Sequence, residues 1–180
     1  VFMLNYDGEY VIPKSREPII EPEIYGGSIT NSRETILNAQ SKMICVPEFV
    51  RKEFAESGYR LILVSNDYWT ELFDNKYSGI YNSQKKAIYI RMGYYSSIPH
   101  EFGHYIQSVL QNHNIADERL KNQLAKLKFT GDDYFMTSDT EFFAEAFAEY
   151  CKNGNRLKES CEAVYTYIDN ALNAFSNLYQ

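Results

Sequence analysis

Two histidines and a glutamate stand at the spacing of a metal-dependent hydrolase motif. The chain carries His100-Glu101-Phe102-Gly103-His104, which is the pattern H-E-x-x-H. On a helix, residues i and i+4 share a face, so we expect His100 and His104 to point at one metal ion. Glu101 lies about 100° further round the helix, where its carboxylate reaches a metal-bound water without ligating the metal. The chain has three histidines, and the motif uses two of them.

A catalytic zinc site needs a third protein ligand besides two histidines. A third histidine in the pattern H-E-x-x-H-x-x-G-x-x-H is excluded, because Gln107 and Leu110 occupy the required positions. We expect the remaining histidine, His113, to lie exposed near the end of the helix. The other route is a glutamate from a later helix, and the sequence offers Glu141 and Glu145.

Glu141 and Glu145 are four residues apart and share one face of a predicted helix. The other sides of this helix carry three phenylalanines, Phe142, Phe143 and Phe147. Such a helix is expected to be buried, and buried carboxylates need partners. We therefore assign Glu141 as the metal ligand. Glu145, one turn further on, is expected to orient a ligating histidine.

Two alternatives stay open for these glutamates. Their roles can be exchanged, or Glu141 can simply cap the helix start in the pattern Ser138-x-x-Glu141. Gly103, inside the motif helix, is expected to allow a close approach beneath the metal or to a neighbouring strand, at a cost of ~1 kcal/mol relative to alanine.

The order of predicted elements is that of an α+β protein. Residues 1–30 form an irregular N-terminal arm, and residues 31–113 hold a small sheet and the motif helix, which Ser96 or Ser97 caps. The sheet contains a buried strand at 59–65 and a hairpin at 79–92. Residues 114–180 form a helical part with the glutamate helix, a break at Gly154 and an amphipathic helix over 156–178. We expect one domain over residues 1–180.

Composition limits the partners and the cysteine chemistry. The net charge of −6 argues against nucleic acid or an anionic membrane as the partner. No apolar run approaches the ~20 residues that span a bilayer. The sequence shows no signal peptide. Because it opens on Val1 and not on Met, we expect a mature or trimmed form whose leader is missing. Cys45, Cys151 and Cys161 lack C-x-x-C spacing, so either Cys151 and Cys161 pair or all three are half-buried thiols.

The motif and the glutamate segment together resemble one known family. Residues 100–104 followed by residues 141–147 closely resemble the catalytic domain of anthrax lethal factor and its relatives. These are gluzincin-type zinc proteases, and the Pro-Pro endopeptidases belong to the same group. The resemblance implies a zincin-like metalloprotease fold, one catalytic Zn²⁺ and secretion. It also places a catalytic tyrosine seven residues before the glutamate ligand, which is Tyr134 here, as a hydrogen-bond donor to the oxyanion.

From these residues we expect a zinc-dependent endopeptidase. His100, His104 and Glu141 hold one Zn²⁺, Glu101 acts as the general base, and zinc and Tyr134 stabilise the oxyanion. A protein or peptide substrate is expected to lie extended beside an edge strand of the hairpin, and the protein is expected to be a monomer. The lethal factor's extra domains do not fit into 180 residues, so its toxin role and substrate do not carry over.

Two rival interpretations belong to other classes. One is an intracellular protease that cleaves a regulator, although such a chain usually carries a DNA-binding module that this sequence lacks. The other is a non-catalytic zinc-binding or protein-binding domain. The intact Glu101 disfavours the second, because a purely structural site has no use for a base.

Overall fold

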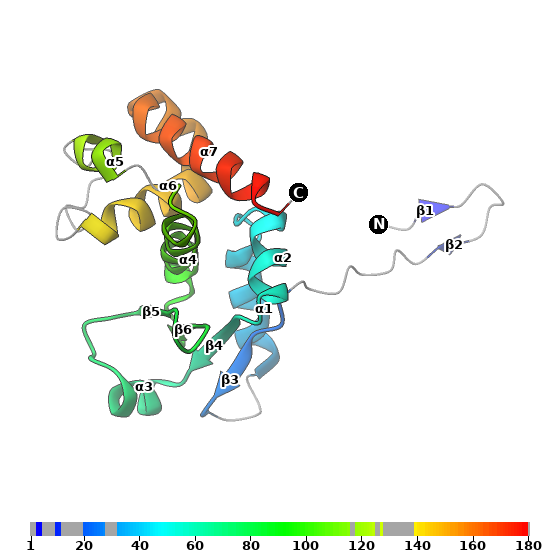
Figure 1. Ribbon diagram of the computed structural model, residues 1–180. Helices are drawn as coiled ribbons and strands as arrows, with labels where there is room; N and C mark the ends of the chain where they lie inside the picture. Colours follow the sequence, from blue (N-terminus) through cyan, green and yellow to red (C-terminus); the bar gives the residue numbers. More distant parts are fainter. Residues whose placement is uncertain are drawn as a thin grey trace.

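A mixed four-stranded sheet packs against the helix that carries the motif (Figure 1). The structure is a computed structural model that describes residues 3–4, 10–11, 20–27, 32–115, 118–124, 127 and 139–179. The strand order is β3 (Glu23–Tyr25), β4 (Arg60–Val64), β6 (Ala87–Arg91) and β5 (Gly79–Asn82). The first three strands are parallel, and β5 is an edge strand antiparallel to β6. A separate antiparallel pair joins β1 (Met3–Leu4) to β2 (Tyr10–Val11).

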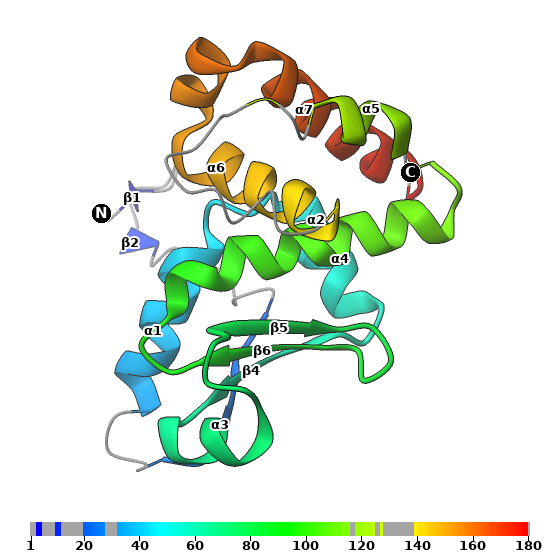
Figure 2. The same cartoon turned by 90° about the vertical axis from the view of Figure 1, so that its left-hand side faces the viewer.

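Helices cover both faces of the four-stranded sheet (Figure 2). Their bounds are α1 (Ser32–Met43), α2 (Glu48–Glu56), α3 (Asn66–Leu72), α4 (Ile98–Asn112), α5 (Glu118–Leu124), α6 (Asp139–Ser160) and α7 (Glu162–Asn177). Helix α4 runs along one face, α6 and α7 lie beyond it, and α3 lies on the opposite side. This layering places α4 between the sheet and the C-terminal helices, where it contacts β5, α6 and α7.

The alternation of side chains along β4 and β6 explains why both faces are covered. One face joins the main core with α1, α2, α4, α6 and α7, through Leu61, Leu63, Ile88 and Ile90. The other face packs against Trp69 of α3, through Ile62, Val64 and Ala87. Successive residues of a strand point to opposite faces, so a strand with apolar residues at nearly every position needs a cover on each side.

The predicted α+β layout is confirmed, with the small sheet and motif helix first and the helical part after them. The irregular arm predicted over residues 1–30 is wrong near its end, because β3 pairs with β4 in the main sheet. The helix predicted over 156–178 is wrong as one element. Helix α6 continues to Ser160, and Cys161, with φ −154° and ψ 73°, separates it from α7. The break expected at Gly154 falls on Asn153, where φ is −144° and ψ is 45°. Apolar periodicity missed the bend at Cys161, because side chains on both sides of it pack against the same core.

Ser97 stands at the predicted N-cap position of the motif helix, but the capping hydrogen bond predicted for it is wrong. A 3₁₀ turn at Tyr95–Ser97 leads into α4, and the Ser97 side chain makes no capping hydrogen bond. Its Oγ instead shares a hydrogen bond of 2.7 Å with Ser78 Oγ. This bond links the entrance of β5 to the start of α4.

Of the two alternatives for the cysteines, the structure has the half-buried thiols and not the Cys151–Cys161 pair. Cys45, Cys151 and Cys161 are free thiols, and Cys151 makes a side-chain hydrogen bond with Cys45 instead of pairing with Cys161. That bond, supported by Lys152 and Lys42, outweighs burial and lowers the pKa of Cys45 to about 7.

Among the described helices, none is long and apolar enough to cross a membrane.

Candidate metal centre

Helix α4 presents the two motif histidines on one side. Its buried side, which includes Phe102, Ile106 and Leu110, packs into the core and fixes how the helix is turned about its axis. The imidazoles of His100 and His104 therefore meet, with their Nε2 atoms 3.1 Å apart. The remaining histidine, His113, is exposed at the C-terminal end of α4, as the sequence predicted.

Helix α6 brings Glu141 to the same point. Three fully buried phenylalanines, Phe142, Phe143 and Phe147, anchor the first half of the helix in the core. Glu141 then faces α4, with Oε2 3.0 Å from His100 Nε2 and 3.6 Å from His104 Nε2. Among the described residues, His100, His104 and Glu141 form a group whose ligand atoms all lie within 4.8 Å of one another.

The spacing of these three atoms fits a tetrahedral metal site. Bonds of about 2.0–2.1 Å to nitrogen and oxygen place tetrahedral ligand atoms roughly 3.3–3.4 Å apart. The three separations of 3.0, 3.1 and 3.6 Å lie on both sides of that value. The cluster can therefore accept a divalent ion with sub-ångström adjustments.

Gly103 allows the two helices to approach closely enough for this geometry. A Cβ atom at position 103 would stand 2.6 Å from the Cα of Ala144 in α6, closer than real Cβ contacts allow. Because Gly103 lies between the two histidines and Ala144 follows Glu141 by one turn, the contact sets the distance between the ligands. The neighbour that needs this glycine is thus α6 and not a strand.

Glu145 holds one of the histidines in place. Its Oε1 lies 2.7 Å from Nδ1 of His100, and the contact leaves Nε2 of the same ring facing Glu141. A carboxylate on the far nitrogen fixes the tautomer of a ligating histidine and increases its basicity. The structure shows the contact, and the role of Glu145 in orienting His100 stays a prediction.

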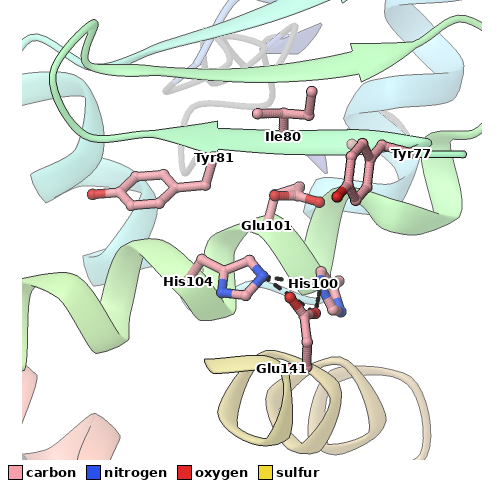
Figure 3. Close-up of a pocket in the computed structure, with 8 residues that line it drawn as sticks. Tyr77, Ile80, Tyr81, His100, Glu101, His104 and Glu141 are labelled. Atoms are coloured by element: carbon pink, nitrogen blue, oxygen red, sulfur yellow. Dashed lines mark hydrogen bonds and ion pairs between the residues drawn. The ribbon is translucent and has the colours of Figure 1, made fainter. Parts of the chain in front are cut away.

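Glu101 is buried between β5 and the histidine pair (Figure 3). Only 5% of it is exposed. A Cβ atom at Gly79 would stand 2.5 Å from Glu101 Oε1, so glycine at the start of β5 leaves room for this carboxylate. The backbone N–H of Tyr81 donates a hydrogen bond to Glu101 from the same strand.

The pKa values of the cluster follow from burial and close contacts. Burial raises the pKa of Glu101, although His100 and His104 oppose the shift. Burial lowers the pKa of His100, but hydrogen bonds to Glu141 and Glu145 outweigh it and raise that pKa to about 10. Burial raises the pKa of Glu141, but contacts with His100 and His104 outweigh it and lower that pKa to about 2. Without metal, the contacts with Glu141 and Glu145 favour the protonated form of His100, so metal binding there competes with a proton.

A cleft of about 380 Å³ opens in front of the cluster. Tyr77, Ile80 and Tyr81 line it from the β5 side, opposite the two histidines and Glu141 (Figure 3). The ring of Tyr81 is held in place, because it stacks on Tyr59 at 13° between ring planes and its hydroxyl lies 3.2 Å from that of Tyr59.

The structure thus gathers five of the six residues singled out in the sequence: His100, Glu101, His104, Glu141 and Glu145. The sixth, Tyr134, lies outside the described residues, as does Ser138 of the alternative capping pattern. Sequence reasoning missed Gly79, Tyr77 and Tyr81 as neighbours of the cluster. Gly79 did carry a signal, because a glycine in a strand often marks a close approach of another group.

The fold and the cluster define a zincin-like protein whose His-His-Glu group is consistent with a zinc metallopeptidase site. The chain belongs to the family described as anthrax toxin lethal factor, N- and C-terminal domain, whose model matches residues 63–171. Among solved structures, it is similar to the Pro-Pro endopeptidase PPEP-2 from Paenibacillus alvei, with a TM-score of 0.62 and 18% identity. That match covers 83% of this chain and 96% of the other. A search of curated proteins found no match.

Proposed function

We propose that the chain is a zinc-dependent endopeptidase. The observation that carries this proposal is the position of Glu101, a buried carboxylate beside the His-His-Glu cluster that is not one of its three members. A metal site that serves only stability gains nothing from a base with a raised pKa at its side. Two nitrogens and one carboxylate oxygen are also a common ligand set of catalytic zinc.

In this proposal, His100, His104 and Glu141 hold the ion. A zinc ion in such a site lowers the pKa of a bound water to about 7 and polarises a carbonyl group. Glu101 accepts a proton from the attacking water and then donates it to the leaving amine. Burial keeps the pKa of Glu101 above its usual value, which suits a group that must both take and return a proton.

The edge strand β5 offers a surface for an extended peptide. The carbonyl of Ser78 accepts from the N–H of Arg91, so alternate residues of this strand bond to β6. The backbone groups of Gly79 and Tyr81 then point away from β6. The N–H of Tyr81 donates to Glu101, so a partner strand would pair with the remaining groups of this edge. We propose that a protein or peptide substrate adds to this edge by β-strand pairing, which lays the scissile bond across the cluster.

Tyr134 completes the proposed chemistry by family resemblance. It is proposed to donate a hydrogen bond to the oxyanion of the tetrahedral intermediate, where one such donor contributes about 10²–10³ in kcat. The test is Tyr134→Phe, which should lower kcat while the melting temperature and zinc content stay unchanged. An unchanged kcat removes this role.

Glu101→Gln tests the function most directly. Hydrolysis of a fluorogenic peptide library should be lost in this variant, whereas stoichiometric zinc, measured by atomic emission, should be retained. Loss of zinc would place Glu101 among the ligands. Wild-type protein that binds zinc and cleaves nothing in the library, with or without chelator, would instead support a non-catalytic zinc-binding domain.

Glu141→Gln and Glu145→Gln separate the roles of the two glutamates. The first should lose zinc, and the second should retain it with affinity weakened about 10–100-fold. Glu149→Gln, on the same helix and also half-buried, is the matched control and should change neither zinc content nor affinity. If Glu145→Gln loses zinc and Glu141→Gln does not, the assignment is reversed.

A further inference from the structure

The cleft continues past His100 into a second, polar arm. This arm has a volume of about 380 Å³ and shares Tyr77, Gly79, His100 and Glu101 with the first arm. Its other lining residues are Lys76, Ser78, Ser96, Ser97, Glu145 and Lys152. The first arm, in contrast, carries Ile80 and Tyr81. The two sides of the metal cluster therefore offer a substrate different chemistry.

The polar arm contains two ammonium groups that a ligand can recruit. Lys152 is exposed on α6, seven residues after Glu145, and makes no ion pair with any other residue in the described part of the chain. Lys76 pairs with Asp74 at 3.6 Å, but both side chains are more than half exposed (63% and 58%). Such an exposed pair is worth about 0–1 kcal/mol and is easily exchanged for another anion.

The carboxylates of the arm are already engaged. Glu145 lies 2.7 Å from Nδ1 of His100, and Glu101 accepts from the backbone of Tyr81. Neither needs a lysine to balance its burial. Lys152 therefore has no ion pair in the described part of the chain that a ligand must break, whereas Lys76 is shared with Asp74 and with the ring of Tyr77, 4.7 Å away. The hydroxyls of Ser96 and Ser97 lie at the same wall, and that of Ser97 is bonded to Ser78.

We propose that the polar arm is a specificity subsite for a carboxylate of the substrate, with Lys152 as its selecting residue and Lys76 in support. The inference deepens the proposed endopeptidase function and rests on it. The ligand is an acidic side chain on the His100 side of the scissile bond, whereas the Tyr81 side receives an apolar residue. A free C-terminal carboxylate has the same chemistry, so the test must separate the two sources.

The test compares glutamate with glutamine in otherwise identical peptides. A peptide that the zinc-loaded protein cleaves is prepared with a C-terminal amide and with Glu or Gln at each of three positions on either side of the bond. We expect Glu at one position, on one side only, to raise kcat/KM about fivefold, which corresponds to an exposed charge pair. The ratio should decrease with added salt. A preference that appears only with a free C-terminus would overturn the side-chain assignment.

Variants of Lys152 assign the preference to this residue. The Glu-to-Gln ratio should fall to about one in Lys152→Ala, and Lys152→Glu should instead prefer lysine at the same position. Lys158→Ala is the matched control, because Lys158 also lies on α6 but sits over the ring of Tyr165 at 5.4 Å, and its ratio should stay at the wild-type value. A ratio of one in the wild type, or a ratio unchanged in Lys152→Ala, overturns the subsite and leaves the endopeptidase function standing.

A binding measurement separates failure of the subsite from failure of the function. Labelled peptide pools with Glu or Gln fixed at one position are titrated against zinc-loaded Glu101→Gln protein, and anisotropy is recorded. Preferred binding of the Glu pool, lost in the Lys152→Ala double variant, supports the subsite even if no peptide is cleaved. Equal affinity for both pools overturns it.

Discussion

Gly103→Ala should weaken metal binding through a contact that lies outside the ligand set. The added Cβ would stand 2.6 Å from the Cα of Ala144, whereas ordinary contacts begin at 3.4 Å, so α4 and α6 must separate locally by about 0.8 Å. The obstructing atom belongs to the backbone of α6, so no side-chain rotation can relieve the contact. Glu141 lies one turn from Ala144 on α6, and a shift of this size exceeds the ~0.2 Å within which metal–ligand distances are held.

The expected magnitude combines two opposing effects on stability. Alanine in place of glycine gains ~1 kcal/mol of helix propensity, and overpacking costs about 1–3 kcal/mol. Because the neighbour is backbone, we expect a net loss of about 1–2 kcal/mol, or a melting temperature lower by roughly 2–8 °C. Zinc affinity should fall about 10–100-fold, as it does when the support of a ligand is disturbed.

The control for this variant is a second glycine, at which an added Cβ atom meets no close neighbour. Gly154→Ala, whose Cβ would meet only Tyr165 at 3.8 Å and which follows the kink at Asn153, should leave both the melting temperature and the zinc affinity close to those of the wild type. Affinity is measured by competition with a chelating dye and stability by circular dichroism. Gly103→Ala protein that binds zinc within twofold of the wild type and melts no lower than the Gly154→Ala control would refute the role of this contact.

Three further predictions concern Gly79, the ionisable groups of the cluster and Cys45. Gly79→Ala should lower kcat and retain zinc, because its Cβ would displace the Glu101 carboxylate; equal kcat, measured with a cleaved peptide, contradicts this. In metal-free protein, the raised pKa of His100 gives stability that is complete below about pH 6.5 and is lost as the pH rises toward 10. The lowered pKa of Glu141 gives stability that is complete above about pH 4.5 and is lost toward pH 2. The melting temperature of the chelated protein should therefore be highest between about pH 4.5 and pH 6.5 and should fall from pH 6.5 to 9. A rise over that range would contradict the assignment. Finally, the lowered pKa of Cys45 predicts faster alkylation by iodoacetamide at pH 7.5 than in the Cys151→Ala variant, followed by peptide mass spectrometry, and equal rates would exclude the thiol contact.

Local spacing was sufficient to group the ligand candidates. His100 and His104 are four residues apart, and a helix places such residues on one face whatever the rest of the fold does. Glu141 was recognised because three phenylalanines around it predicted a buried helix, in which a carboxylate requires a partner. The structure brings these three side chains together.

Errors arose where the outcome depended on neighbours distant in the sequence. The hydroxyl of Ser97 bonds to Ser78, which lies just before β5 and 19 residues earlier in the chain, so the capping preference of serine did not decide its contacts. The bend at Cys161 leaves the apolar pattern unbroken, because α6 and α7 both bury their apolar residues in the same core. Propensity and periodicity describe one segment at a time and contain neither of these contacts.

The sequence by itself determined which groups are available: two imidazoles and a carboxylate on one helix, and a glutamate on a second helix. Only the tertiary structure decided how these groups meet. Gly103 sets the separation of α4 from α6, and Gly79 gives Glu101 its place beneath the edge strand. The polar arm likewise exists only because Lys76 and Lys152, 76 positions apart in the chain, line one cavity. The helical repeat fixes relations within a turn or two, whereas distances between elements follow from the packing of the whole core.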